Sequence, residues 1–259
     1  MSEAMKARMR HWLEQIRHAH DPQHQLANRS PWLPVLRAWQ AGRLSATYTD
    51  LQAQPRFAAA CNFFLSDLYG EQDFSQRDRD VERIFPVMVR LLPEAVLGTV
   101  AVALELNGLS HLLDLRMAAR LDAHGMPGEL DELRYAQAYA VASDVADRRH
   151  QLALILALGR GLDRIVQKRM VRELLALCHW PAKLAGLGAL QSFLERGFAA
   201  FTELQGAGPF LRAVADREHA FMRRMLELGG LRDAARAQGS GPRAQQERKP
   251  VGRCFVGSI

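Results

Sequence analysis

Three pairs of acidic and histidine residues stand three positions apart in the sequence. They are His111 with Asp114, Asp147 with His150, and Asp216 with His219. In a helix, residues at this spacing share one face, so each pair could present an oxygen and a nitrogen ligand together. Helical bundles with dinuclear iron or manganese centres use pairs of this kind, with further glutamates from facing helices. The spacing therefore raises the possibility of a metal-dependent oxidase.

A metal centre would need further carboxylates from a facing helix. If the chain turns near Met126, Glu105 lies across from Arg148, within a turn of Asp147 and His150. The candidate metal ligands are Glu105, His111, Asp114, Asp147, His150, Glu218 and His219.

Two observations weigh against a metal ion. The bundle motif uses Glu-x-x-His twice, whereas these pairs carry the shorter Asp and one of them runs in the reverse order. Arg148 and Arg149 are also placed to neutralise Glu105 in ordinary ion pairs. We therefore prefer an ion-pair layer that includes Asp147 and His150, with a bound metal ion as the alternative.

A second group of charged residues follows the stretch "CNFFLSDLYG" at residues 61–70. Acidic and phenolic groups end one predicted helix, and an Arg-Asp-Arg run begins the next. Arginine and carboxylate groups at such a corner can form a bidentate clamp. The sequence predicts a structural clamp made of Asp67, Tyr69, Arg77 and Asp78.

The elements that must position these residues are all predicted to be helices. Leu, Ala and Arg dominate and aromatic residues make up only 7% of the chain, which favours helices. Breaks are expected at Gly42, Gly159–Gly161 and residues 178–181, and a close helix crossing at Gly186 and Gly188. The expected helices cover residues 3–20, 31–42, 56–69, 76–92, 94–123 and 129–158, then one ending at 177, one over 182–204 and one over 209–228.

Three runs resemble a family of uncharacterised bacterial all-helical proteins. The runs are "TYTDLQAQPRFAAACNFFLSDLYG", "DFSQRDRDVERIFPVMVRLLP" and "LAGLGALQSFLERGFAAFTELQGAGPFLRAVADRE". Within them, FFLxDLYG and GLGALQxFLExGF are the most distinctive motifs. The resemblance spans about residues 43–219 and implies an all-helical fold. It implies no known activity and no catalytic residue.

The formal charge of +6 is concentrated at the two ends of the chain. Residues 232–253 hold six Lys or Arg and two acidic residues, a net +4, and the first twenty residues hold four and two, a net +2. The body is therefore neutral, and no basic stripe with interleaved aromatic residues indicates nucleic acid binding. Three cysteines without metal-ligand spacing favour a reducing cytoplasm. We find neither a signal peptide nor a run of eighteen apolar residues, so we expect no membrane insertion.

These observations predict an all-α protein with one domain over residues 1–231. We expect about eight helices around a central antiparallel hairpin, followed by a flexible basic tail over residues 232–259. The expected function is that of a soluble, non-enzymatic interaction or scaffold protein, which would bind a protein partner through a helical groove. The alternative is a metal-dependent, di-iron-type oxidase with a ferritin-like or haem-oxygenase-like bundle. The sequence leaves the oligomeric state open.

Overall fold

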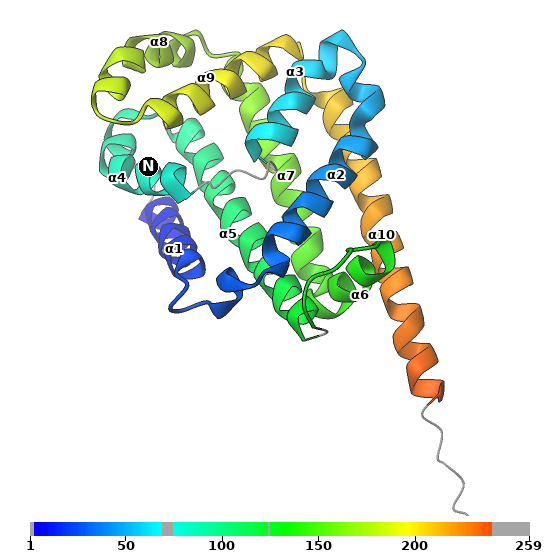
Figure 1. Ribbon diagram of the computed structural model, residues 1–259. Helices are drawn as coiled ribbons and strands as arrows, with labels where there is room; N and C mark the ends of the chain where they lie inside the picture. Colours follow the sequence, from blue (N-terminus) through cyan, green and yellow to red (C-terminus); the bar gives the residue numbers. More distant parts are fainter. Residues whose placement is uncertain (1–2, 69–74, 124, 240–259) are drawn as a thin grey trace, which may run out of the picture.

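The structure is a computed structural model that describes residues 3–68, 75–123 and 125–239. All regular structure in this part of the chain is helical, which confirms the all-α prediction (Figure 1). It holds ten α-helices, two more than expected. They are α1 (Glu3–His20), α2 (Trp32–Gln52), α3 (Pro55–Phe63), α4 (Ser75–Leu91), α5 (Glu94–Asp122), α6 (Glu132–Ala142), α7 (Val145–Val166), α8 (Arg169–Leu184), α9 (Gly188–Glu203) and α10 (Gly208–Gly239). A 3-10 turn, η1 (Leu26–Arg29), precedes α2, and a π-helical turn, η2 (Phe64–Leu68), follows α3.

Helix α5 is the central element and forms the predicted antiparallel hairpin with α7. Thr99 near the start of α5 faces Gly161 near the end of α7, and Arg116 near the end of α5 pairs with Asp147 at the start of α7. The two helices therefore run in opposite directions. Helix α5 also packs against α1, α2 and α6. Figure 1 shows α5 running through the middle of the molecule, with α1 and α4 on one side and α7 on the other.

Several predicted boundaries were wrong. The predicted helix 129–158 is two helices, because Asp144 caps α7 by accepting a hydrogen bond from the Ala146 N–H at 3.0 Å. Gly42 lies inside α2, and Gly159 and Gly161 lie inside α7. Helix α8 continues through residues 178–181.

The glycines near residue 186 do not mark a helix crossing. Gly186 has a φ of +73° and ends the turn after α8, and Gly188 begins α9. The close approaches lie elsewhere. A Cβ at Gly161 would meet the Oγ1 atom of Thr99 at 2.6 Å, and one at Gly108 would meet the Trp12 ring at 2.8 Å.

Helix α10 extends to Gly239, so the backbone remains helical for eight residues beyond the predicted start of the tail at residue 232. Residues 240–259 lie outside the described part of the chain. Within the described residues, α5 is long and apolar enough to cross a bilayer, and 56% of its most apolar window is buried inside the protein. A core helix has the same properties, and α5 occupies the core.

A polar cavity as the candidate functional site

A cavity of about 570 Å³ lies among the helices and is partly open to solvent. Its walls come from every described α-helix except α8, and from η1 and η2. Protein interiors are packed about as densely as organic crystals and contain few voids larger than a water molecule. The cavity is instead within the size range of pockets that hold small organic ligands.

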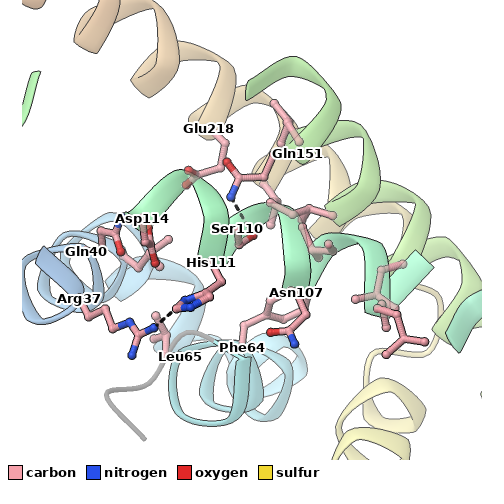
Figure 2. Close-up of a pocket in the computed structure, with 18 of the residues that line it drawn as sticks. Arg37, Gln40, Phe64, Leu65, Asn107, Ser110, His111, Asp114, Gln151 and Glu218 are labelled. Atoms are coloured by element: carbon pink, nitrogen blue, oxygen red, sulfur yellow. Dashed lines mark hydrogen bonds between the residues drawn. The ribbon is translucent and has the colours of Figure 1, made fainter. Parts of the chain in front are cut away.

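One part of the cavity is apolar. Phe64 and Leu65 enter it from the π-helical turn η2, and Ala103 and Ile155 line it from α5 and α7. Figure 2 shows Phe64 and Leu65 beside the α5 residues that line the cavity. Aliphatic and aromatic side chains from α4, α9 and α10 complete this part; they are Val81, Ile84, Met88, Leu190, Phe193, Phe210 and Val214. An apolar ligand body would be desolvated here.

The other part of the cavity is polar and strongly charged. Its lining includes three arginines and two carboxylates, which are Arg37, Arg43, Arg148, Asp114 and Glu218. Figure 2 shows Ser110, His111 and Asp114 projecting from α5, with residues of α2 on one side and Gln151 and Glu218 on the other. Three cations against two anions leave one excess positive charge when all five groups are ionised.

Arg43 and Glu218 form the ion pair that links α2 to α10. Arg43 Nη1 lies 2.6 Å from Glu218 Oε1, which also accepts a hydrogen bond from the Tyr48 hydroxyl at 2.8 Å. The guanidinium carbon lies 3.9 Å from the centre of the Phe221 ring. Burial acts to lower the pKa of Arg43, but Glu218 outweighs it and the pKa is raised. Within the described residues, the buried Nε of Arg43 has no hydrogen-bond partner.

Arg148 is a buried cation with neutral partners. Only 5% of it is exposed. Nε donates to the Ser143 hydroxyl at 3.0 Å, Nη1 to Gln151 Oε1 at 3.1 Å, and Nη2 contacts the Met117 sulfur at 3.0 Å. The guanidinium also lies over Tyr139, 4.1 Å from the ring centre. A thioether is a weak acceptor, so this guanidinium retains donor capacity.

Asp114 lies between the arginines. Gln40 Nε2 donates to its Oδ1 at 3.0 Å and also approaches the Tyr135 hydroxyl at 3.5 Å. Burial raises the pKa of Asp114, while the Gln40 hydrogen bond and the charges of Arg37 and Arg148 oppose that rise. Burial likewise raises the pKa of Tyr135, and Arg148 and Arg43 oppose it. Asp114 thus interacts electrostatically with Arg37 and Arg148, and Tyr135 with Arg148 and Arg43. The three arginines therefore lie in one connected region.

His111 is held as a neutral imidazole of defined tautomer. Arg37 can only donate, so its Nη2, at 3.0 Å, requires His111 Nδ1 to accept. The proton therefore sits on Nε2, which donates to the Ala19 carbonyl at 3.2 Å and to Asn28 Oδ1 at 3.1 Å. Burial, followed by the charges of His20 and Arg37, lowers the pKa of His111 to about 3. With both nitrogens engaged, His111 positions Arg37 and has no free lone pair for a metal ion.

The structure separates the seven candidate metal ligands. His111, Asp114 and Glu218 line the cavity, each with the partners given above. Asp147 pairs with Arg116 on the surface at 2.8 Å, and exposed His219 contacts the Ala215 carbonyl at 2.8 Å. Within the described residues, no group of three or more His, Cys, Asp and Glu side chains is arranged to hold a metal ion.

Glu105 and His150 are neighbours, as the hairpin register indicated. His150 Nε2 lies 2.7 Å from Glu105 Oε1, and Arg8 of α1 donates to Oε2 of the same carboxylate. Burial acts to raise the pKa of Glu105, but the hydrogen bonds from Arg8 and His150 outweigh it and lower the pKa. Arg148 does not take part in this ion-pair group, because its side chain points into the cavity.

Two further groups are the predicted clamp and the cysteine that lines the cavity. The proposed clamp of Asp67, Tyr69, Arg77 and Asp78 depends on side chains outside the described part of the structure. Cys61 lines the cavity but is only 2% exposed, and burial raises its thiol pKa to about 11. A thiol with so high a pKa is a poor nucleophile at neutral pH.

The sequence analysis missed the polar residues that α2 contributes, namely Arg37, Gln40 and Arg43. Their spacing of three residues places them on one helical face. The buried residues of the same helix, Leu36, Leu44 and Tyr48, lie close to that face in sequence register. Polar residues repeated at helical spacing among core positions were the signal that could have found this wall of the cavity.

Comparison with known proteins places most of the chain in one family. Residues 18–229 match the family model described as "Domain of unknown function (DUF8198)". All three runs on which the sequence resemblance rested fall inside this range. A search of curated proteins found no significant match, and neither did a search of solved structures.

Proposed function

We propose, for a chain that belongs to the DUF8198 family of unknown function, that the interior cavity binds a small organic molecule. One observation carries this proposal: a partly open cavity of about 570 Å³ among the helices, lined by both apolar and charged groups. The apolar part of such a lining is exposed to water when the cavity holds no ligand, which is unfavourable. A bound ligand would remove that apolar surface from water.

The composition of the walls supports a binding role. Ligand pockets combine a mainly apolar lining with a few converging polar groups that orient the ligand. Here the polar groups come from α2, α5, α6, α7 and α10, which lie far apart in the sequence. Several are fixed by second contacts, such as the Ser110 hydroxyl that accepts a hydrogen bond from Gln151 at 2.8 Å. The proposal keeps the non-enzymatic binding role expected from the sequence, with a small molecule in place of a protein partner.

The test compares a variant that fills the cavity with the wild-type protein. Ala103 is a half-buried residue of α5 that lines the cavity, so Ala103→Phe places a ring inside the void. We expect the wild-type protein to bind the neutral apolar dye N-phenylnaphthylamine, with an increase in dye fluorescence. Ala103→Phe should abolish most of that increase and retain the helical circular dichroism spectrum. Native mass spectrometry of the purified protein should also show a co-purifying molecule that Ala103→Phe lacks.

Ala119→Phe is the matched control, because Ala119 lies on the exposed side of the same helix. It adds the same ring to α5 without entering the cavity. It should bind the dye as the wild-type protein does. Equal dye binding by Ala103→Phe and Ala119→Phe, with no co-purifying molecule in any of the three proteins, would refute a ligand-binding cavity.

A further inference from the structure

The charges that line the cavity differ in number. Arg37, Arg43 and Arg148 are opposed by Asp114 and Glu218 only. Glu218 is committed to Arg43 at 2.6 Å, and the Asp114 carboxylate is hydrogen-bonded by the amide of Gln40. Placing an uncompensated charge in a protein interior is costly, and such charges are normally paired. With all five groups ionised, the lining of the cavity therefore lacks one negative charge.

The donors needed to bind an anion are also present. The buried Nε of Arg43 has no hydrogen-bond partner within the described residues. Arg148 Nη2 donates to the sulfur of Met117, which is a weak acceptor. Both guanidinium groups line the same cavity, and the charges of both act on the pKa of Tyr135. Arginine forms its strongest hydrogen bonds with oxyanions, to which it can donate two parallel N–H groups.

The remainder of the cavity indicates what the anion is attached to. The wall beyond the arginines is formed by side chains such as Phe64, Leu65, Ile155 and Phe193, which offer no hydrogen bonds. A small inorganic anion would leave this wall unfilled. A monocarboxylate with an apolar body matches both parts of the lining.

We propose that the cavity binds an organic monocarboxylate, with its carboxylate among Arg37, Arg43 and Arg148 and its aliphatic or aromatic body against η2, α7 and α9. The inference rests on the proposed ligand-binding function and adds the chemical class of the ligand. The carboxylate supplies the missing negative charge and accepts hydrogen bonds from the unused guanidinium donors. The apolar body fills the part of the void that offers no polar contact.

The test measures how much the acid group contributes to binding affinity, by comparing probes that differ only in that group. Dodecanoate is compared with dodecanol, and phenylbutyrate with phenylbutanol, by displacement of N-phenylnaphthylamine from the wild-type protein. At least one acid should bind about tenfold or more tighter than its alcohol, the size expected of one charge-assisted hydrogen bond. Because the cavity is partly open to solvent, this preference should fall as the salt concentration rises.

Variants then locate the acid group. Arg148→Met removes the charge but retains an unbranched apolar side chain, and Arg37→Met does the same from α2. Each folded variant should lose most of the preference for acid over alcohol. Arg116→Met is the control, because Arg116 is exposed on α5 and pairs with Asp147 outside the cavity. It removes the same charge and should retain the full preference.

The outcomes separate this inference from the function on which it rests. If the dye binds and Ala103→Phe abolishes its binding, the cavity is a ligand site. The carboxylate proposal is then refuted, and the binding function stands, if each alcohol displaces the dye at the same concentration as its acid. The same conclusion follows if neither acid displaces the dye. If Arg148→Met and Arg37→Met both fold and keep the acid preference, the proposed position of the carboxylate is wrong. If the dye does not bind to the wild-type protein and no molecule co-purifies, both proposals fail. The comparison of acid with alcohol in the wild-type protein requires no variant to fold.

Discussion

Arg148 shows what a buried guanidinium does when its hydrogen-bond partners are neutral. Within the described residues, its donors meet a hydroxyl, an amide and a sulfur, and its charge lies over the Tyr139 ring. The aromatic face offers some compensation for lost water. Burial raises the pKa of Tyr139 to about 12, so the phenol stays neutral and cannot act as the counterion. Asp114 interacts electrostatically with Arg148, but burial disfavours the charge of its carboxylate.

His111 leads to a prediction about the pH dependence of stability. Its pKa is about 3 in the folded protein and about 6.5 in an unfolded chain, so between these values only the unfolded chain binds the proton. The contribution of His111 to the free energy of unfolding should therefore be greatest above about pH 6.5 and should fall as the pH is lowered toward 3. His111→Gln keeps a neutral hydrogen-bonding side chain and should flatten this dependence, as measured by urea unfolding between these pH values.

His219→Gln is the control for that measurement, because His219 is exposed on α10 and its hydrogen bond within the described residues is to the backbone carbonyl of Ala215. Its unfolding free energy should follow pH as the wild-type protein does. Glu105 adds to the acid sensitivity, because its lowered pKa also favours the folded state at higher pH. Some slope should therefore remain in His111→Gln. An unchanged slope would show that His111 is protonated without cost in the folded state.

Helix boundaries show how far the sequence determines the fold. Helices α1, α4 and α5 were predicted to within one or two residues at each end, because each begins or ends at clear capping or proline signals. Glycine was misleading in α2 and α7. The same residue type can end a helix or allow a close crossing, and the sequence does not show which applies until the partner helix is known.

The break between α6 and α7 is directly relevant to the cavity. Residues 143–144 interrupt what reads as one helix, and Asp144 supplies the cap of the second. Ser143, in the break, accepts the hydrogen bond from Arg148 Nε. The break therefore helps to aim Arg148 inward. The sequence contained the capping signal, but its consequence for Arg148 depends on how α5, α6 and α7 pack together.

Gly161 of α7 provides a test of the close crossing with α5. An added Cβ would meet Thr99 at 2.6 Å (Oγ1) and 3.2 Å (Cβ), and the second of these atoms cannot rotate away. Gly161→Ala should therefore lower the free energy of unfolding by about 1–3 kcal/mol, despite the better helix propensity of alanine. Gly42→Ala in α2 is the control. A Cβ there meets nothing within 4 Å, so stability should rise by up to about 1 kcal/mol. Stabilisation by both changes would mean that α5 and α7 are not in close contact.

Exposed apolar residues are concentrated on one face of α8. Leu177, Trp180 and Leu184 are 70–87% exposed, whereas Val171 on the opposite side is buried. Their spacing of three, four and seven residues places them on a single stripe. Within the described residues, α8 packs chiefly on α9 and α7 through its other side.

The protein as a whole should respond to hydrostatic pressure according to the size of its cavity. Unfolding removes internal voids and lowers the volume of the system, so a protein with a large void unfolds at lower pressure. Ala103→Phe should raise the pressure at the midpoint of unfolding, measured by intrinsic tryptophan fluorescence, because it fills part of the 570 Å³ void. Ala119→Phe should leave that midpoint unchanged. Equal midpoints for the two variants would indicate that water fills the partly open cavity, so that it adds no empty volume to the folded state.

The candidate site was much less predictable than the fold, because it is a property of the whole molecule. The register of the hairpin was enough to place Glu105 beside His150, now found at 2.7 Å. The cavity needs side chains from α2, α5, α7 and α10 at once, and no local pattern contains that arrangement. Arginines in a sequence are also normally interpreted as surface residues, because they are rarely buried without a partner.

The position of α10 has a consequence for how the protein is made. In the described part of the chain this helix follows all the others, and its residues Glu218 and Phe221 form the wall that contacts Arg43. While the ribosome is still translating residues 208–230, Arg43 has neither its carboxylate nor its aromatic cover. The guanidinium of Arg43 therefore stays hydrated in the nascent chain until α10 emerges. The proposed binding of a ligand to the cavity accordingly requires a chain whose translation has passed α10.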